Sequence, residues 1–239
     1  MRPPLLSLFL FAIPFFAASG WAASADEWVR TVLEKLAPGA YTADLDFVNY
    51  RVDGTESPYS LRLSSLNEDA VFVLFSEPRR DAGRQILNKA GEIWSYLPDS
   101  RKVVRLSDRD SIGNGDFNNA DVLKLTWVRD YSAKVAKDGA KQVVVDMDAR
   151  TNTATYYRMR LWIDKATGQP LQQYFYDEAG HHLKTLQYQK PVSFDGLVRP
   201  AFLLMINVQT GQKTSLTYKS FAKAPGLTAA RFLPENLGK

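Results

Sequence analysis

Apolar and polar residues alternate with a period of two along most of this chain, which is the spacing of a half-buried β-strand. In the first such segment Tyr41, Ala43, Leu45 and Phe47 share one face, and the residues between them are polar. Similar alternation or short apolar runs recur at residues 60–66, 70–75, 85–88, 93–97, 103–107, 132–136, 142–146, 155–163, 171–176, 184–189, 203–208 and 215–221. The pattern predicts an antiparallel sheet with one wet face.

Glycine-bearing turn sequences separate these segments at close and regular intervals. They occur at residues 52–54, 89–91, 137–139, 166–168, 178–180 and 209–211. Short strands joined by such turns predict consecutive hairpins, and hence a mainly β protein built as an antiparallel meander. About eleven strands in one sheet accumulate enough twist to make the sheet curl or close. No linker interrupts the pattern, so we expect one domain over residues 26–239.

Three segments depart from the strand pattern. Residues 28–36 repeat apolar positions at spacings of three and four, which predicts a short amphipathic helix. Residues 111–123 are rich in turn formers and offer Asn118 or Asn119 as the N-cap of another short helix. We expect this segment to cross the mouth or one face of the curved sheet. A last helical turn is predicted at residues 228–233.

The N-terminal residues 1–25 have the order of a secretory signal peptide: Arg2, an apolar run over residues 5–18, and then a stretch of small residues. The apolar run is shorter than the ~20 residues that a bilayer-spanning helix needs. We therefore expect a peptide that is cleaved after Ala22 or Ala25, and a mature protein that is soluble outside the cytoplasm.

Few residues are available for ordinary catalytic chemistry. The chain has no cysteine, which excludes disulfides, thiol nucleophiles and cysteine-ligated metals. Its two histidines, His181 and His182, are adjacent, and neighbouring residues on a strand point to opposite faces. We interpret them as the tip of a hairpin, and we expect no catalytic residue, no metal and no cofactor.

Carboxylates two residues apart are the remaining candidates for catalysis. The pairs are Asp44 with Asp46, Asp108 with Asp110, and Asp146 with Asp148. This spacing places both groups on one strand face, which suits acid–base work but is equally typical of a solvated polar face, the interpretation that we favour. The net charge is +4, and the basic residues do not form a clustered stripe of the kind that binds nucleic acid.

Aromatic residues make up 12% of the chain, although few helices are predicted. The contiguous run at residues 174–176 places large rings on both faces of the sheet, which is unusual for a sheet with one wet face. Either both faces are covered, or one face lines a cavity for an apolar guest. We expect a concave surface that holds a hydrophobic ligand.

Positive charge gathers in two short clusters. One consists of Arg79, Arg80 and Arg84, and the other of Arg101, Lys102, Arg105 and Arg109. Such a cluster is usually a solvated edge that also discourages unwanted strand pairing. The alternative is a docking patch for an anionic partner such as a phospholipid surface.

Motifs between residues 78 and 123 carry a family resemblance. Residues 78–87 read P-x4-G-x3-L, residues 94–98 read W-x-Y-L-P, residues 101–105 form a basic strand, and Asp116-Phe117 is followed by Asp121. With these motifs the chain resembles the outer-membrane lipoprotein-sorting protein family, in its larger LolA-like branch. Outside this stretch the likeness rests on strand order and length.

The resemblance implies a periplasmic half-barrel, in which the strongly curved meander wraps around a few short helices. It also implies a monomeric carrier, not an enzyme. Its hydrophobic cavity would shelter the acyl chains of a lipoprotein or lipid between an inner-membrane exporter and an outer-membrane acceptor. Two alternatives of the same fold are a periplasmic lipid-sensing regulatory module and, ranked lower, an envelope-lipid hydrolase.

Candidate site residues follow from the strand pattern and the resemblance together. We expect the acyl cavity to be lined by Phe47, Leu63, Trp94, Tyr96, Met159, Leu161, Phe175 and Met205. Residues 111–123 are expected to act as a gate or lid that includes Asp116, Phe117 and Asp121. Five residues of the two basic clusters would form the docking patch: Arg79, Arg80, Arg101, Lys102 and Arg105.

Overall fold

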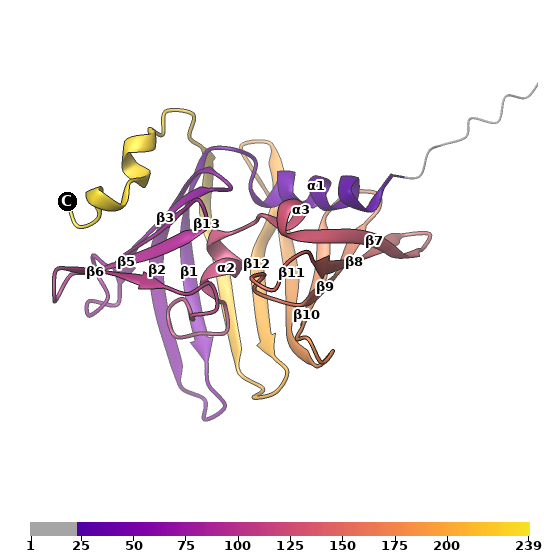
Figure 1. The fold of residues 1–239 in the computed structure, drawn as a ribbon, viewed down its shortest axis with the longest axis horizontal. Helices are drawn as coiled ribbons and strands as arrows, with labels where there is room; N and C mark the ends of the chain where they lie inside the picture. The colour runs from indigo at the N-terminus through magenta and orange to yellow at the C-terminus, as the bar shows by residue number, and fades with distance from the viewer. Residues whose placement is uncertain (1–22) are drawn as a thin grey trace, which may run out of the picture.

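The computed structural model describes residues 23–239, and in them one antiparallel sheet of thirteen strands curves around three short helices (Figure 1). The strands are β1 (Tyr41–Tyr50), β2 (Glu56–Asn67), β3 (Ala70–Glu77), β4 (Gln85–Lys89), β5 (Glu92–Leu97), β6 (Lys102–Leu106), β7 (Tyr131–Asp138), β8 (Gln142–Ala149), β9 (Arg158–Asp164), β10 (Pro170–Tyr176), β11 (His182–Phe194), β12 (Leu197–Asn207) and β13 (Lys213–Lys223). The predicted signal peptide lies almost entirely outside the described residues.

The sheet follows the order of the chain, as the turn sequences predict, except where its two halves join. Hairpins connect β1 through β6 in one half and β7 through β13 in the other. β1 pairs with β13 in the middle of the sheet, which leaves β6 and β7 as the two edges. Each of the thirteen predicted segments contains a strand, so the sheet has two strands more than the expected number of about eleven.

Residues 107–130 carry the chain from edge strand β6 to edge strand β7, and we call them the crossover segment. They contain the short helices α2 (Asn119–Leu123) and α3 (Trp127–Asp130). α2 starts at the predicted N-cap Asn118, whose N–H donates to the Asp121 carboxylate at 2.8 Å. The crossover segment covers one face of the sheet, the inner face, as the sequence predicts.

α1 (Ala25–Leu36) also packs on the inner face, where it contacts β7 and β12. Ser24 caps this helix: its hydroxyl accepts the N–H of Glu27 at 3.3 Å, and the Glu27 carboxylate accepts the N–H of Ser24. The predicted apolar stripe, which includes Val29 and Val32, is buried. No helix within residues 23–239 is long and apolar enough to span a bilayer.

Two apolar clusters occupy opposite faces of the sheet. The main cluster lies on the inner face, beneath α1 and the crossover segment. The outer cluster lies on the other face, beneath the C-terminal segment, where the predicted last helical turn is the 3-10 helix η1 (Ala229–Phe232). The buried members of the outer cluster are Ala70, Phe72, Leu87, Phe232 and Leu237. Figure 1 shows the C-terminal segment in yellow beside β3, well apart from α1.

Aromatic rings lie on both faces of the sheet, as the run at residues 174–176 predicts. Phe175 points to the inner face and joins the main cluster. Tyr174 lies on the outer face, where its ring is 4.6 Å from Trp162 and 4.4 Å from His182 between centroids. The aromatic content is therefore divided between a core and a half-exposed row of rings.

Candidate functional site

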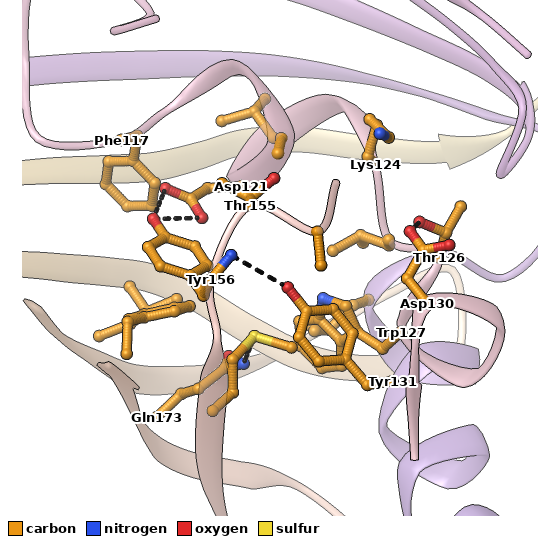
Figure 2. A pocket seen from close by; sticks show the side chains of 18 of the residues that line it. Phe117, Asp121, Lys124, Thr126, Trp127, Asp130, Tyr131, Thr155, Tyr156 and Gln173 are labelled. Carbon is orange, nitrogen blue, oxygen red and sulfur yellow. Dashed lines mark hydrogen bonds between the residues drawn. The ribbon is translucent and has the colours of Figure 1, made fainter. Parts of the chain in front are cut away.

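A cavity of about 150 Å³ lies between the inner face of the sheet and the crossover segment. Its walls come from the end of α1, from α2 and α3, from the connection between β8 and β9, and from inner-face side chains of β9 to β13 (Figure 2). Trp127, Met159, Phe175 and Leu203 are among its apolar lining residues. Charged side chains also line it, among them Lys124, Arg129 and Asp130, and its volume is that of a cavity that holds benzene.

The structure distributes the predicted cavity residues over three places. Met159 and Phe175 line the cavity itself. Four others belong to the main cluster without reaching the cavity wall: Phe47, Leu63, Leu161 and Met205. These four side chains are at most 2% exposed and form the packed floor of the inner face.

Trp94 and Tyr96 do not line the cavity, and their prediction as cavity residues is wrong. Both pack against the outer cluster. The Trp94 ring lies 4.9 Å beneath the guanidinium of Arg105, and the Tyr96 ring abuts Gly238. Successive residues of β5 alternate between faces, and register places Ile93 on the inner face, so its neighbour Trp94 must point outward.

The segment proposed as a gate is anchored to the sheet by the two gate residues Asp116 and Phe117. Phe117 is 1% exposed, and its ring lies 5.3 Å from that of Phe47. The N–H of Asp116 donates to Thr214 Oγ1 at 2.8 Å, and Asn207 Nδ2 donates to the Asp116 carboxylate at 3.2 Å. Both apolar packing and polar contacts therefore hold the segment against the sheet.

The third gate residue, Asp121, stands at the centre of a polar cluster that we call the latch: Asp121, Asn118, Tyr156 and Lys184. The Tyr156 hydroxyl donates to the Asp121 carboxylate at 3.0 Å (Figure 2). Lys184 Nζ donates to Asn118 Oδ1 at 2.8 Å and to the Asp116 carbonyl at 2.6 Å. The latch thus joins α2, the β8–β9 connection and β11 at one point.

Burial shifts the pKa values of the titratable groups in the latch. It raises the pKa of Asp121, against the opposing charge of Lys184, and it lowers the pKa of Lys184. It also raises the pKa of Tyr156 well above 10 and that of the neighbouring Tyr131 to about 12. Both phenols therefore stay neutral at physiological pH and act as hydrogen-bond donors or acceptors.

A second hollow, of about 660 Å³, adjoins the cavity on the far side of the β8–β9 connection. It is lined by a mixture of polar, charged and aromatic side chains, among them Arg109, Tyr157, Tyr176 and Lys184. Tyr156 lines both hollows and forms part of the wall between them. Displacing this wall would join the two spaces into one.

The basic residues lie at one end of the sheet, away from the cavity. Arg79 and Arg80 are in the β3–β4 turn, and Arg101 and Lys102 are at the β5–β6 turn. These two turns touch, because a Cβ on Gly83 would lie 3.7 Å from Pro98. All are exposed, as is Arg105 on β6. Arg80 pairs with Asp81 and Arg105 with Glu92, so part of the positive charge is neutralised locally.

The other titratable candidates form local ion pairs. His181 pairs with Asp177 at 2.9 Å at the predicted hairpin tip, and residues 23–239 contain no group of three side chains placed to hold a metal ion. The paired carboxylates Asp146 and Asp148 form ion pairs with arginines of β9 on the outer face. Asp148 is partly exposed, whereas Asp146 is only 6% exposed beside Arg160.

Sequence reasoning missed Tyr156 and Lys184, the two residues that link the gate to the rest of the site. Tyr156 was visible as one of many strand aromatics, but nothing in the sequence distinguished it from a core ring. Lys184 stands alone on a predicted strand and carries no local signal. Both gain their role from the meeting of β11 with the crossover segment, which are far apart in the chain.

The chain was compared with protein families and with curated proteins. A protein-family model whose description reads "Uncharacterized protein" matches residues 67–239. No curated protein matches the chain.

Three solved structures share the architecture over nearly the whole chain. A LolA superfamily protein from Nitrosomonas europaea is 21% identical, with 89% of this chain and 98% of that chain covered and a TM-score of 0.81. A putative outer membrane lipoprotein-sorting protein domain from Vibrio parahaemolyticus is 24% identical, with 90% and 100% covered and a TM-score of 0.79. A DUF1329 family protein from Desulfovibrio piger is 18% identical, with 90% and 100% covered and a TM-score of 0.78. The fold that the motifs predict is confirmed.

Proposed function

The chain belongs to the family whose model matches residues 67–239, it has the LolA fold, and from these premises we propose that it carries the acyl chains of a lipoprotein or lipid. The observation that carries the proposal is the cavity between the inner face and the crossover segment, which Met159, Phe175 and Leu203 line with apolar side chains. A hydrocarbon chain gains about 0.8 kcal/mol for each methylene that leaves water. Such a chain needs a shelter to cross an aqueous compartment.

The cavity as it stands is the closed state of this carrier. Its volume of about 150 Å³ suits a benzene-sized guest, whereas an acyl chain is several times larger. Loading therefore requires the crossover segment or the β8–β9 connection to move. The adjoining hollow of about 660 Å³ supplies the space that such a movement would add.

The gate in this proposal is the segment 111–123, and the latch holds it shut. Opening breaks the contacts of Asp121 with Tyr156 and of Lys184 with the crossover segment. Hydrogen bonds to charged groups are worth about 1.5–3 kcal/mol each, so the closed state is favoured when no cargo or partner is bound. Release then needs a partner that prefers the open state.

The partners in the proposal are an inner-membrane exporter and an outer-membrane acceptor, reached through the periplasm. The exposed basic residues around Arg79 and Arg101 would dock against an anionic partner surface. We also propose that the signal peptide is cleaved after Ala22, because cleavage after Ala25 would remove the Ser24 cap of α1. Sequencing the N-terminus of the protein from a periplasmic fraction tests both the compartment and the cleavage site.

A reversible cross-link tests the gate. A Cβ on Gly115 would lie 2.9 Å from Cγ of Asn49 on β1 and 2.7 Å from Thr214 Oγ1, so Asn49→Cys with Gly115→Cys places the two thiols next to each other with a small shift of Thr214. The chain has no other cysteine. We expect the oxidised double variant to lose uptake of the apolar dye phenylnaphthylamine, and the same protein to regain uptake on reduction.

The reduced double variant is the matched control for this experiment. Equal dye uptake by the oxidised and reduced forms would contradict the gate. Absence of dye and lipid binding by the wild-type protein would contradict the carrier function itself. Native mass spectrometry of the protein purified from the periplasm adds the identity of any lipid that is retained.

A further inference from the structure

Arg199 is a fully buried arginine on the inner face of β12. Arg199 is 0% exposed, and it precedes Ala201, Leu203 and Met205 along the same face of the strand. Its Nη1 donates to the carbonyl of Leu36 at 3.2 Å, at the C-terminal end of α1. The negative end of the helix dipole favours a cation there. This contact accounts for one edge of the guanidinium.

Two aromatic rings pack against the guanidinium. Its central carbon lies 3.9 Å from the centroid of Tyr218 and 4.2 Å from that of Phe221. Stacking on rings stabilises a cation, but it does not satisfy the N–H groups in the guanidinium plane. The in-plane edge opposite the helix contact therefore still needs acceptors.

The edge of the guanidinium formed by Nε and Nη2 faces no hydrogen-bond acceptor among the described residues. Within residues 23–239, Nε and Nη2 of Arg199 have no hydrogen-bond partner, and none of the ion pairs in this part of the chain involves Arg199. Residues 1–22 contain no aspartate or glutamate in their sequence. A buried charge without a counter-ion is strongly unfavourable unless something else supplies the opposite charge.

The free edge has the geometry that this chain uses elsewhere to hold a carboxylate. Arg62 donates from Nε and Nη2 to the two oxygens of Asp44 at 2.7 and 2.9 Å. Arg160 does the same with Asp146 at 2.6 and 2.8 Å. In Arg199 the same two nitrogens are buried and unoccupied by any group of residues 23–239. A planar, two-pronged oxyanion is the ligand that this fork fits.

The fork lies directly behind one end wall of the cavity. Leu36 and Tyr218, which contact the guanidinium, both line the cavity, and so does Leu203 farther along β12. The Tyr218 ring borders the cavity and also contacts the guanidinium. A shift of that ring would bring an anionic group in the cavity onto the free edge of Arg199.

We propose that Arg199 binds the anionic head group of an amphiphile whose hydrocarbon chain occupies the cavity. The chemistry is that of a carboxylate or a phosphate monoester, bound through Nε and Nη2, with the chain directed toward Met159 and Phe175. This inference rests on the proposed carrier function and adds a head-group site to it. The same guanidinium anchors α1, so head-group binding and helix position are linked through one side chain.

Three probes with the same hydrocarbon chain test the proposal: hexadecanoate, hexadecyl phosphate and hexadecanol. Each is titrated into the wild-type protein by displacement of bound phenylnaphthylamine. We expect at least one of the anionic probes to bind roughly tenfold or more tightly than hexadecanol, as expected for hydrogen bonds to a charged group. Comparison of hexadecanoate with hexadecyl phosphate distinguishes a carboxylate site from a phosphate site.

Arg199→Met keeps the length and apolar character of the side chain and removes the fork. We expect this variant to lose the preference for the anionic probes and to keep the wild-type affinity for hexadecanol. Arg231→Met is the matched control, because Arg231 also stacks on a ring, Phe72, but belongs to the outer cluster. That variant should keep the preference for anions.

The outcomes separate the two proposals. Equal binding of all three probes to the wild-type protein would overturn the head-group site and leave the carrier function standing. A preference that survives in Arg199→Met would also overturn it. Binding of none of the three probes would overturn the carrier function. Equal binding of the three probes to the wild-type protein would overturn the head-group site even if Arg199→Met does not fold.

Discussion

The main cluster and the outer cluster are both built from apolar and aromatic side chains, yet only the main cluster is associated with the cavity described here. The outer cluster is covered by its own chain end, whose Phe232 is 0% exposed and inserts directly among Phe72 and Leu87. The main cluster is covered in part by the crossover segment, which polar contacts also hold in place. A cover secured by polar anchors does not have to fill the space beneath it.

The comparison also explains why ring content alone does not locate a ligand site. Trp94 and Tyr96 are as aromatic as any cavity residue, but they form part of a packed surface beside the outer cluster. What differs between the regions is the element that lies over the rings. Substitutions that add bulk, remove bulk or remove charge in one region and not the other therefore test the comparison directly.

The largest expected effect is on stability in the outer cluster. Phe232→Ala removes a fully buried ring from a filled cluster, and we expect the free energy of unfolding to fall by about 3–5 kcal/mol. Chemical denaturation measures this change. Binding of phenylnaphthylamine should stay at the wild-type level under conditions in which the variant is folded. A loss of binding in the folded variant would show that the two clusters are coupled.

A matched pair of alanines contrasts the filled and the hollow region. Ala70 is buried in the outer cluster, so Ala70→Leu should overpack it and lower the free energy of unfolding by about 1–3 kcal/mol. Ala120 lines the cavity, so Ala120→Leu should occupy free space and change stability by less than about 1 kcal/mol.

The same pair separates stability from binding. Ala120→Leu is expected to weaken dye binding at least roughly tenfold, because it fills the space that the guest needs, while Ala70→Leu leaves binding unchanged. Equal stability losses in the two variants would mean that the cavity offers no usable room. Unchanged binding in Ala120→Leu would place the guest elsewhere.

The latch predicts a pH effect with a definite sign. Because burial raises the pKa of Asp121, the folded protein binds the Asp121 proton more tightly than the unfolded chain does. The resulting stabilisation is complete below the ordinary pKa of 3.8 and is lost as the pH rises through the higher folded-state pKa. Other carboxylates, such as Asp44, have lowered pKa values and act in the opposite direction.

Asp121→Asn isolates this contribution, because asparagine still offers an oxygen to the Tyr156 hydroxyl. The substitution should change stability by about 0.5–1.5 kcal/mol, the worth of one hydrogen bond. The difference in free energy of unfolding, wild type minus variant, should decrease as the pH rises from acid to neutral. A difference that grows with pH would contradict the burial of a charged Asp121.

The smallest expected effect concerns the ring that the sequence misplaced. Arg105→Ala removes an exposed cation from above Trp94 and from its pair with Glu92, and we expect a loss of at most about 1 kcal/mol. Urea titration measures this loss. Dye binding should be unchanged, since Trp94 lies on the outer face. Weaker dye binding would indicate that Trp94 contributes to the cavity.

The local pattern was sufficient to predict the elements and much of their connection. Alternation located all thirteen strands, the Gly-bearing turns joined them into hairpins, and the spacing of Val29 and Val32 predicted α1. The N-cap at Asn118 was also readable, because capping depends on neighbouring residues alone. These features are properties of short stretches of chain.

The site was predicted only in part, because its residues come together from distant strands. Met159 and Phe175 were chosen correctly as inner-face residues, while Trp94 and Tyr96 were assigned to the wrong face of β5. A period of two shows that two faces exist, but it does not say which one is inner. Lys184 and Arg199 had no local signal at all.

The sequence by itself determined a meander of short strands, one capped helix and a long interruption after the sixth strand, because each follows from side chains a few residues apart. Only the tertiary structure decided that β1 pairs with β13, that the interruption bridges the two edges, and that a hollow remains beneath it. These features depend on how faces, ends and covers meet across the whole sheet. A buried Arg199 with a free edge is visible only once its neighbours are in place.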